Sequence, residues 1–389
     1  MIGMWDIFNV QKTGWSFNVF YLMLLYLFII LISLISHLVL FLLRKLYQPI
    51  KQRKKERWII LLHRCQEQGE YAVSISKLRR LKNDISLAAW DEALLDGLSE
   101  GVDVNRFLKE NSKALISIGL HMKREPVRAY YAWIFSDLEK HGVVLSKDYY
   151  KIFILDLRNS DSIYTRENAL KAIYWFNETA FLTDAWVTLS HRHLYHSSKL
   201  LANDLLEAGG NAEDHAKGLM ENYNALEACF RVAVINYLRY EHINTWDKAL
   251  AGYLQSEESS TDVKCCIIRK LGTSGNADNA GVLLEVLRKN GNAADWEPAA
   301  VAASMLRYFP SAETEKGLLE SLRSPSWYVR TNAASALVDL GINEEQKHVV
   351  LLGNDAYARD ALLWALSKKA DEKAGRFGRS GKQQEQRRL

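Results

Sequence analysis

The chain has 389 residues, of which 48% are hydrophobic and 25% are charged, values typical of a folded protein with one large or two to three ordinary domains. Only five prolines and 21 glycines occur, and this scarcity favours a mostly helical protein with short connections. Residues 58–369 carry a net charge of −5, which argues against a protein that coats DNA or RNA, because neutralising phosphates requires an excess of Lys and Arg.

The first predicted element is an uncharged apolar segment, residues 19–43, which reads VFYLMLLYLFIILISLISHLVLFLL. As a helix that rises about 1.5 Å per residue, it exceeds the hydrocarbon thickness of a bilayer, about 30 Å. A cleaved signal peptide is the alternative, but such a peptide has a positive start, a shorter apolar core and a small-residue cleavage site. We therefore expect a permanent transmembrane helix after a short extracytoplasmic N-terminus, residues 1–18.

Three polar residues interrupt the apolar segment: Ser33, Ser36 and His37. Polar groups in lipid usually face a partner, so we expect these side chains to pack against another membrane helix. A proton-relay role and a simple interfacial role are the alternatives for His37.

A basic segment follows at residues 44–57, with seven positive charges against a lone Glu56. The positive-inside rule places this side in the cytoplasm and predicts a single-pass protein of the cell (inner) membrane with its N-terminus outside. Beside a membrane span, such a segment is expected to act as a topology signal and to contact anionic lipid. The predicted lipid-headgroup contacts are Arg44, Lys45, Lys51, Arg53, Lys54, Lys55 and Arg57.

Residues 58–124 read as helices without a clear repeat phase, and we expect them to form the helical N-terminal part of a larger array. The four cysteines of the chain form no C-x-x-C pair, and Cys265 and Cys266 are adjacent. Adjacent cysteines cannot easily bridge locally, so buried free thiols in a reducing compartment are predicted.

A repeat occupies residues 125–369. Eight starting positions recur at intervals of 29 to 38 residues, and the side chains three and seven residues after each start are apolar or aromatic. Positions three and seven after a start share one helical face, so each start opens an amphipathic helix. The starts are Arg128, Arg166, Lys199, Arg231, Lys264, Pro298, Arg330 and Arg359.

A second set of helices lies between these, as in LLEVLR at residues 283–288 and LLESLR at residues 318–323. Each unit is therefore predicted to be two antiparallel helices, with Ser, Asn and Asp supplying N-cap oxygens ahead of the second helix. Such a pair buries its apolar face only by stacking on its neighbours. The predicted fold is all-α: an N-terminal transmembrane helix followed by an α-solenoid of about seven to eight helix pairs.

Two stretches carry a family resemblance: SPSWYVRTNAASALVDLG, residues 324–341, and NDAYARDALLWALSKK, residues 354–369. They resemble HEAT or HEAT-like (armadillo-type) repeats, whose second helix begins with a polar turn residue, a Val-Arg-like pair and an Ala-x-x-Ala-Leu run. The resemblance implies an extended surface that holds another protein. Pro298 replaces the usual basic residue and interrupts the row of basic side chains.

Catalytic and cofactor motifs are not found in the sequence. HRHLYH, residues 191–196, could place His193 and His196 on one helical face, but no carboxylate pair flanks them. The glycine-containing turns lack the Gly-Lys-Ser/Thr of a nucleotide site, and no nucleophile elbow appears. We expect no catalytic residue, cofactor or metal, and hence a non-enzymatic protein.

Partner binding is predicted instead, by another membrane protein and with no nucleic acid. Tyr130, Trp133 and Trp175 fall off the strict apolar positions of the repeat and could form a binding patch, with core filling as the alternative. The candidate partner-binding residues are these three aromatic residues together with Arg128, Arg166, Arg231, Arg330 and Arg359.

The last segment, residues 370–389, carries a net charge of +3 without an apolar period and is predicted to be a disordered basic tail. The function expected is a membrane-anchored cytoplasmic scaffold that organises or regulates a larger membrane protein. Its layout resembles bacterial membrane proteins that accompany processive membrane glycosyltransferases in exopolysaccharide synthesis. The alternatives are a membrane-tethered regulator that senses a ligand or lipid, and an enzyme of the HEAT-like DNA glycosylase or bilin lyase type.

Overall fold

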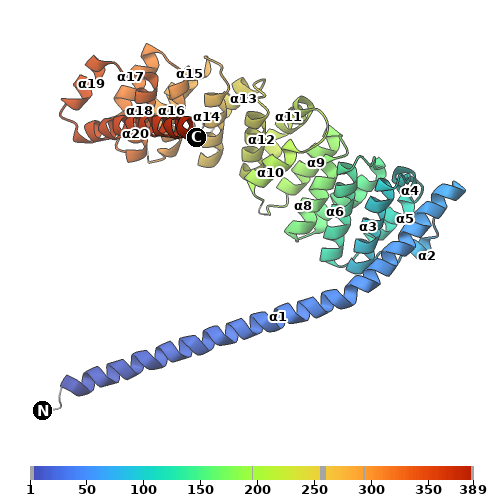
Figure 1. Ribbon diagram of the computed structural model, residues 1–389. Helices are drawn as coiled ribbons and strands as arrows, with labels where there is room; N and C mark the ends of the chain where they lie inside the picture. The colour runs from blue at the N-terminus through green and yellow to red at the C-terminus, as the bar shows by residue number, and fades with distance from the viewer. Residues whose placement is uncertain (1–3, 195, 255–259, 292–293, 387–389) are drawn as a thin grey trace. The chain divides into compact units, whose positions relative to one another are not determined.

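The computed structural model describes residues 4–386 apart from 195, 255–259 and 292–293. Side chains are described for these residues except 4–20, 44 and 373–386. Within these residues the protein is all-helical, and no strand occurs among them (Figure 1). Packing divides the chain into two units, Met1–Ile152 and Phe153–Leu389. The boundary falls between the starts Arg128 and Arg166, which are separated by the longest interval of the repeat. The predicted array from residue 125 to 369 is therefore divided near its beginning.

Unit 1 contains one long helix and a set of short ones, and its last helix continues into unit 2. The elements are α1 (Met4–Gln68), α2 (Ile75–Leu78), α3 (Asp84–Ser99), α4 (Val104–Glu110), α5 (Ser112–Leu120), α6 (Glu125–Lys140), the 3-10 turn η1 (Lys147–Tyr149) and α7 (Tyr150–Asn159).

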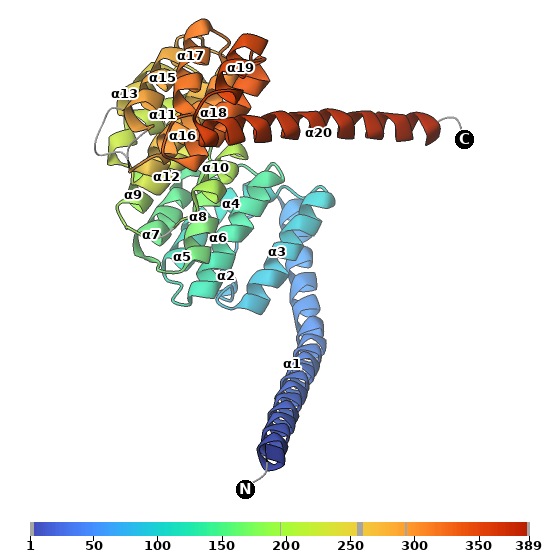
Figure 2. The same cartoon turned by 90° about the vertical axis from the view of Figure 1, so that its left-hand side faces the viewer.

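Helix α1 joins three segments that the sequence separates: the N-terminus, the apolar segment and the basic segment. Its C-terminal part packs on α3, where Leu62 is fully buried and Cys65 nearly so. The large apolar side chains from Tyr21 to Leu43 are all exposed, and Figures 1 and 2 show this part of α1 extending beyond the rest of unit 1. Only its C-terminal third therefore belongs to the core of unit 1.

Unit 2 consists of helices joined by short turns, and it carries most of the predicted repeat. The elements are α8 (Ile163–Tyr174), α9 (Thr179–Ser190), α10 (Ser198–Leu206), α11 (Ala212–Glu221), η2 (Tyr223–Ala225), α12 (Ala228–Tyr240), α13 (Asp247–Tyr253), α14 (Thr261–Thr273), α15 (Asn279–Asn290), α16 (Glu297–Met305), η3 (Leu306–Tyr308), α17 (Ala312–Ser321), α18 (Trp327–Leu340), α19 (Glu344–Leu351) and α20 (Ala356–Gln386).

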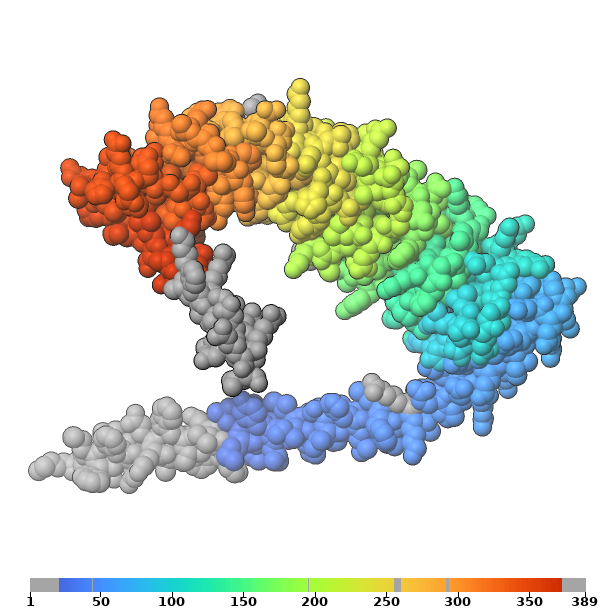
Figure 3. All heavy atoms as spheres, turned by 45° about the horizontal axis from the view of Figure 1, so that its top comes forward, coloured from blue at the N-terminus to red at the C-terminus, as the bar shows by residue number. Residues whose placement is uncertain are grey.

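The even-numbered helices from α10 to α20 are the second helices of the predicted pairs, and each contacts the next in order. In the space-filling view the colours of unit 2 accordingly pass in sequence from green to red (Figure 3). All eight predicted starts lie within the first four residues of a helix. Twelve of the sixteen apolar positions counted from them are buried, which confirms the repeat phase as a core-forming pattern.

The four exceptions to this burial lie on α10, α16 and α20. Leu206 is 37% exposed because it is the last residue of α10, a helix of nine residues. Val301, Met305 and Leu366 are half-buried. The end of a short helix thus explains the exposure of Leu206, whereas helix length does not explain Val301 or Leu366.

The predicted tail differs from the structure. Helix α20 continues through residues 370–386 and ends at Gln386, whereas residues 387–389 lie outside the described part of the chain (Figure 2). Lys, Arg, Gln, Glu and Ala are strong helix formers. Residues 370–386 lack an apolar face that could pack on other helices, but their side chains still favour a helical backbone.

Close approach between second helices explains why small side chains recur in the repeat. A Cβ added to Gly272 of α14 would lie 2.5 Å from the Cβ of Met305 on α16. On α18, Ala333, Ala334 and Ala336 are fully buried at the equivalent layer. Small residues thus let neighbouring helix pairs of unit 2 come together at backbone distance.

Two glycine variants of unit 2 should change stability in opposite directions. Gly272→Ala should lower the melting temperature, because overpacking a tight contact costs about 1–3 kcal/mol. Gly281→Ala on α15 meets nothing within 4 Å and should raise it, because Ala is favoured over Gly in a helix by about 1 kcal/mol. Scanning calorimetry of the detergent-solubilised full chain measures both. A rise in both variants would contradict the close approach of α14 and α16.

Candidate interaction surface

Two of the predicted arginines hold the turn that precedes their own helix. Arg231 donates from Nε to the carbonyl oxygen of Leu226 at 2.6 Å and from Nη2 to that of Asn224 at 3.0 Å. Arg330 donates from Nη1 to the carbonyl oxygens of Ser324 at 2.6 Å and of the next residue at 3.0 Å. Carbonyl groups at a turn need such donors, so these guanidinium groups stabilise the fold locally.

Arg166 makes the same kind of contact in a buried setting. It is 3% exposed and donates from Nη1 to the carbonyl oxygen of Ser160 and from Nε to Nε2 of His196, both at 3.2 Å. Burial, with the positive charge of Arg166 as a second cause, lowers the pKa of His196 to about 4. We therefore withdraw Arg166 from the candidate partner-binding residues, because its side chain does not reach the surface.

The other two arginines are half-buried. The Nη1 of Arg128 lies 3.5 Å from Oε1 of Glu125, one turn earlier on α6. Arg359 lies in the first turn of α20. Partner binding by Arg128, Arg231, Arg330 and Arg359 stays a prediction.

Tyr130 and Trp133 of α6 lie together. Their rings are stacked with centroids 5.5 Å apart, and Trp133 is 38% exposed. The hydroxyl of Tyr130 donates to Oδ2 of Asp91 at 2.8 Å. Burial raises the pKa of Asp91 to about 6, although this hydrogen bond opposes the shift. Trp175, at the C-terminus of α8, is half-buried.

A larger aromatic group, which the sequence did not single out, lies at the N-terminal ends of three successive second helices. Trp296 precedes α16, Trp327 and Tyr328 open α18, and Tyr357 is the second residue of α20. The last three are 58%, 53% and 70% exposed. We call these four residues the aromatic surface.

Ring contacts join the members of the aromatic surface across helices. Trp296 stacks on Tyr328 with centroids 4.4 Å apart and planes 2° from parallel, and Trp327 meets Tyr328 edge-on at 5.0 Å. The guanidinium carbon of Arg330 lies 5.0 Å from the ring centroid of Tyr357. These contacts hold exposed rings in place without burying them. A fixed apolar surface of this kind loses little entropy when a partner covers it.

A hollow of about 680 Å³ lies next to the aromatic surface, lined by the starts of α14, α16 and α18. Trp296 and Tyr328 form its apolar part, while Asp262, Arg269 and Glu297 supply charges of both signs. An apolar centre with a mixed polar rim is the usual anatomy of a protein interface.

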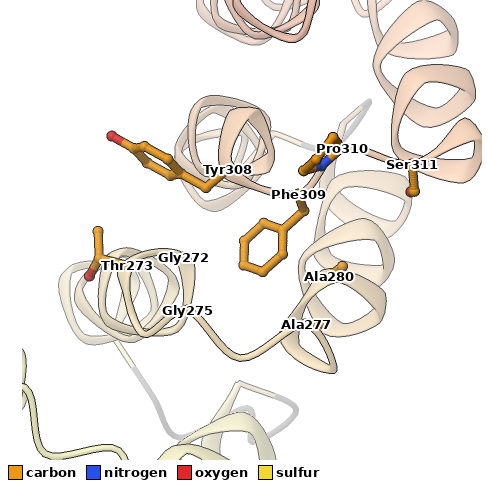
Figure 4. Close-up of a pocket in the computed structure, with 9 residues that line it drawn as sticks. All are labelled: Gly272, Thr273, Gly275, Ala277, Ala280, Tyr308, Phe309, Pro310 and Ser311. Carbon is orange, nitrogen blue, oxygen red and sulfur yellow. The ribbon is translucent and has the colours of Figure 1, made fainter.

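A second cavity in unit 2, about 520 Å³, lies between the end of α14 and the turn after α16. In Figure 4 the Phe309 side chain points toward the turn that carries Gly275 and Ala277, whereas Tyr308 points away from it. None of the described residues that line this cavity is charged. Its polar side chains are the hydroxyl groups of Thr273, Tyr308 and Ser311.

The histidines of the HRHLYH stretch, residues 191–196, make contacts that do not form a metal site. His193 of this stretch pairs with Glu227, and His196 is the buried acceptor of Arg166. Within the described part of the chain, no group of three or more His, Cys, Asp or Glu side chains is arranged to hold a metal. The four cysteines are free thiols.

The apolar part of α1 is the remaining candidate surface. Among the described residues, one helix, Tyr21–Gln68, is long and apolar enough to cross a membrane by length and composition. Nδ1 of His37 donates to the carbonyl oxygen of Ser33 at 2.7 Å, one turn earlier, so this polar group is paired within its own helix. Ser33, Ser36 and His37 are all exposed.

Comparison with known proteins gives one family match. The family model described as HEAT repeat matches residues 316–343, which cover the end of α17, all of α18 and the turn after it. Residues 316–343 resemble a HEAT repeat. This match and the stacked helix pairs support a HEAT-like helical repeat protein, an architecture that points to a protein-interaction scaffold.

Other comparisons add little to the HEAT-like assignment. A crystal structure of an engineered protein is similar over 82% of this chain and 95% of its own, with 14% sequence identity and a TM-score of 0.34. A TM-score this low does not identify a shared fold. No curated protein matches the sequence.

Proposed function

We propose that this HEAT-like protein is a membrane-anchored scaffold that binds another membrane protein through the aromatic surface of unit 2. The observation that carries the proposal is the exposure of Trp327, Tyr328 and Tyr357 at the same end of neighbouring second helices. Tyr and Trp are the residues most enriched where binding energy concentrates in interfaces. The aromatic surface is continuous across repeats, which suits an extended partner.

The apolar segment of α1 supports the anchoring part of the proposal. Its side chains from Tyr21 to Leu43 have no cover within unit 1, and a basic segment follows at once. By the positive-inside rule both units would lie in the cytoplasm, beneath an inner membrane. The net charge of −5 over residues 58–369 favours a protein partner over nucleic acid.

The finer proposal concerns the partner. The layout of one apolar helix, a basic segment and a HEAT-like body suggests an accessory subunit of a processive membrane glycosyltransferase in exopolysaccharide synthesis. Ser33, Ser36 and His37 would then lie against a transmembrane helix of that enzyme, where polar side chains find partners.

Co-purification tests the proposal. The full chain with a C-terminal tag, purified in mild detergent, should recover a multi-span membrane protein in fixed ratio. Trp327→Ala with Tyr328→Ala should lower the recovered partner more than tenfold, because truncating an interface anchor costs about 2 kcal/mol or more. Quantitative mass spectrometry of the eluate measures the ratio.

Tyr308→Ala is the matched control for this experiment. Tyr308 is 59% exposed but lies after the C-terminal end of α16, away from the helix starts that carry the aromatic surface. It should leave recovery unchanged. If the wild-type chain is recovered alone as a monomer, or acts on a nucleotide or sugar substrate, the scaffold proposal fails.

A further inference from the structure

A basic cavity in unit 1 is not explained by a protein-binding scaffold. It encloses about 610 Å³ between α1, α2 and the start of α3, a volume typical of small-molecule sites. Lys54, Arg57 and Arg64 of α1 line one wall. Spacings of three and seven residues place these three side chains along one face of the helix.

The opposite wall is equally basic. Lys77 comes from α2, while Arg79, Arg80 and Lys82 come from the turn between α2 and α3. With the α1 residues they bring seven positive side chains to one cavity. None of the described residues that line it carries a carboxylate.

Two other lysines of α1 are neutralised by carboxylates, unlike the basic side chains that line the cavity. Lys51 lies 2.6 Å from Oε1 of Glu92, and Lys55 lies 2.6 Å from Oδ2 of Asp96, both on α3. The two lysines thus face an acidic side of α3 and are paired within the fold. Carboxylates thus neutralise α1 lysines on the α3 side, whereas none lines the cavity among the described residues.

The start of α3 adds to the positive potential. Asn83 and Ser86 line the cavity, and the side chain of Asn83 accepts from the Ser86 N–H as the N-cap of this 16-residue helix. The hydroxyl of Ser86 accepts from Nζ of Lys54 at 2.7 Å. A helix N-terminus carries partial positive charge. A cleft lined by one sign of charge focuses the field and concentrates counter-ions.

The cavity also has an apolar wall. Trp58, Ile60 and Leu61 of α1 line it beside the basic side chains, and Ile60 is 59% exposed. An anion that also carries an organic part would contact both kinds of side chain. Inorganic anions alone would leave the apolar wall exposed.

We propose that this cavity binds a phosphorylated organic anion. Lys and Arg side chains donate charge-assisted hydrogen bonds to phosphate oxygens, and Trp58 contacts the organic part. The ligand comes from one of two sources: a soluble molecule such as a nucleoside polyphosphate, or the headgroup of an anionic phospholipid. This site goes beyond the scaffold function and does not depend on it.

Position along α1 favours the soluble source. Lys54 and Arg64 follow Leu43 by 11 and 21 residues, which corresponds to about 16 Å and 32 Å along a helix. Headgroup layers extend only about 5–8 Å beyond the hydrocarbon on each side. With residues 19–43 upright in a bilayer, the cavity would lie beyond the headgroups.

Calorimetric titration of the delipidated full chain in neutral detergent tests the proposal and separates the two sources. The soluble probes are ATP and inorganic pyrophosphate, and the lipid probes are dioctanoyl phosphatidylglycerol and dioctanoyl phosphatidylcholine. We expect ATP to bind more tightly than pyrophosphate. Added salt should weaken binding, because phosphate contacts release counter-ions.

Variants locate the binding. Lys77→Gln with Lys82→Gln removes two exposed charges from the cavity and should weaken ATP binding at least about tenfold. Lys113→Gln with Lys123→Gln removes two exposed charges from unit 1 outside the cavity lining and should change it less than about twofold.

If phosphatidylglycerol is the one probe that binds, and the cavity variant loses this binding, the ligand is a lipid headgroup and the proposal stands. If no probe binds, or if both double variants weaken binding equally, the proposal is wrong. Neither result depends on recovery of a protein partner, so this test and the scaffold test fail separately.

Discussion

Lys270→Met is expected to destabilise unit 2 by about 3–5 kcal/mol, because it removes one member of a buried ion pair and leaves the other uncompensated. Nζ of Lys270 lies 3.0 Å from Oδ1 of Asp247 and 2.6 Å from Oδ1 of Asn244. Asn279 completes the network by donating to Oδ2 of Asp247 at 3.1 Å. Lys270 is 1% and Asp247 3% exposed, so water cannot replace the lost contact.

The loss should appear in two measurements on the full chain. Calorimetry should show the melting temperature of unit 2 lowered by about 6–20 °C. Hydrogen exchange should show lost protection in peptides that cover α13, α14 and α15. A second variant, Lys270→Met with Asp247→Leu, removes both charges and should recover part of the stability.

Lys289→Met on α15 is the matched control. Lys289 pairs with Glu285 at 2.6 Å, but its side chain is 66% exposed. Exposed pairs of this kind contribute about 0.5 kcal/mol or less. If both Lys→Met changes lowered the melting temperature equally, the buried ion pair would contribute no more to the stability of unit 2 than the exposed one.

Glu139→Gln should stabilise unit 1 by up to about 3 kcal/mol at pH 7, and by less as the pH falls. Glu139 of α6 is 8% exposed, and its Oε2 has no hydrogen-bond partner among the described residues. Burial raises the pKa of Glu139 from 4.5 to about 9. The folded protein therefore holds a proton that the unfolded chain releases above about pH 4.5.

The sign of the effect follows from that proton. Between about pH 4.5 and pH 9 the folded state binds more protons than the unfolded state, so wild-type stability falls as pH rises. The glutamine variant does not titrate. The difference in melting temperature between variant and wild type should grow from pH 5 to pH 8, reaching about 6–12 °C.

Glu70→Gln serves as the control for this series. Glu70 is an exposed carboxylate of the same unit, and its replacement should change the free energy of unfolding by no more than about 0.5 kcal/mol at each pH. A melting-temperature difference for Glu139→Gln that does not change between pH 5 and pH 8 would show that Glu139 is ionised in the folded protein.

Periodicity predicted the helices of unit 2 and their core faces, because apolar side chains that recur on one helical face must be buried. Ala333 and Leu337 of α18 illustrate this: both lie at predicted positions and both are fully buried. The boundary at Ile152 could not be predicted in this way, since the phase continues across it. The repeat phase indicates which face of a helix is apolar, but it does not indicate which neighbouring helix covers that face.

The functional surfaces were harder to predict for a related reason. Arginine at five of the eight starts suggested partner binding, but Arg231 and Arg330 reach back to carbonyl oxygens of their own turns. Tyr357 and Trp327 could have been found from the sequence as large aromatic residues one to three positions before a repeat start. The basic cavity depends on α1 and the segment from Lys77 to Ser86 lining the same space, a tertiary arrangement without a local signal.

Continuity of α1 has a mechanical consequence. Tyr21 and Lys54 belong to one unbroken helix, so the apolar segment and one wall of the basic cavity are parts of the same rod. A single residue inserted near Tyr47 would turn the two ends by about 100° relative to each other. Pro49 lies between them and removes one backbone hydrogen bond, so torque at the apolar end would be absorbed in part at this residue before it reached the basic side chains of the cavity.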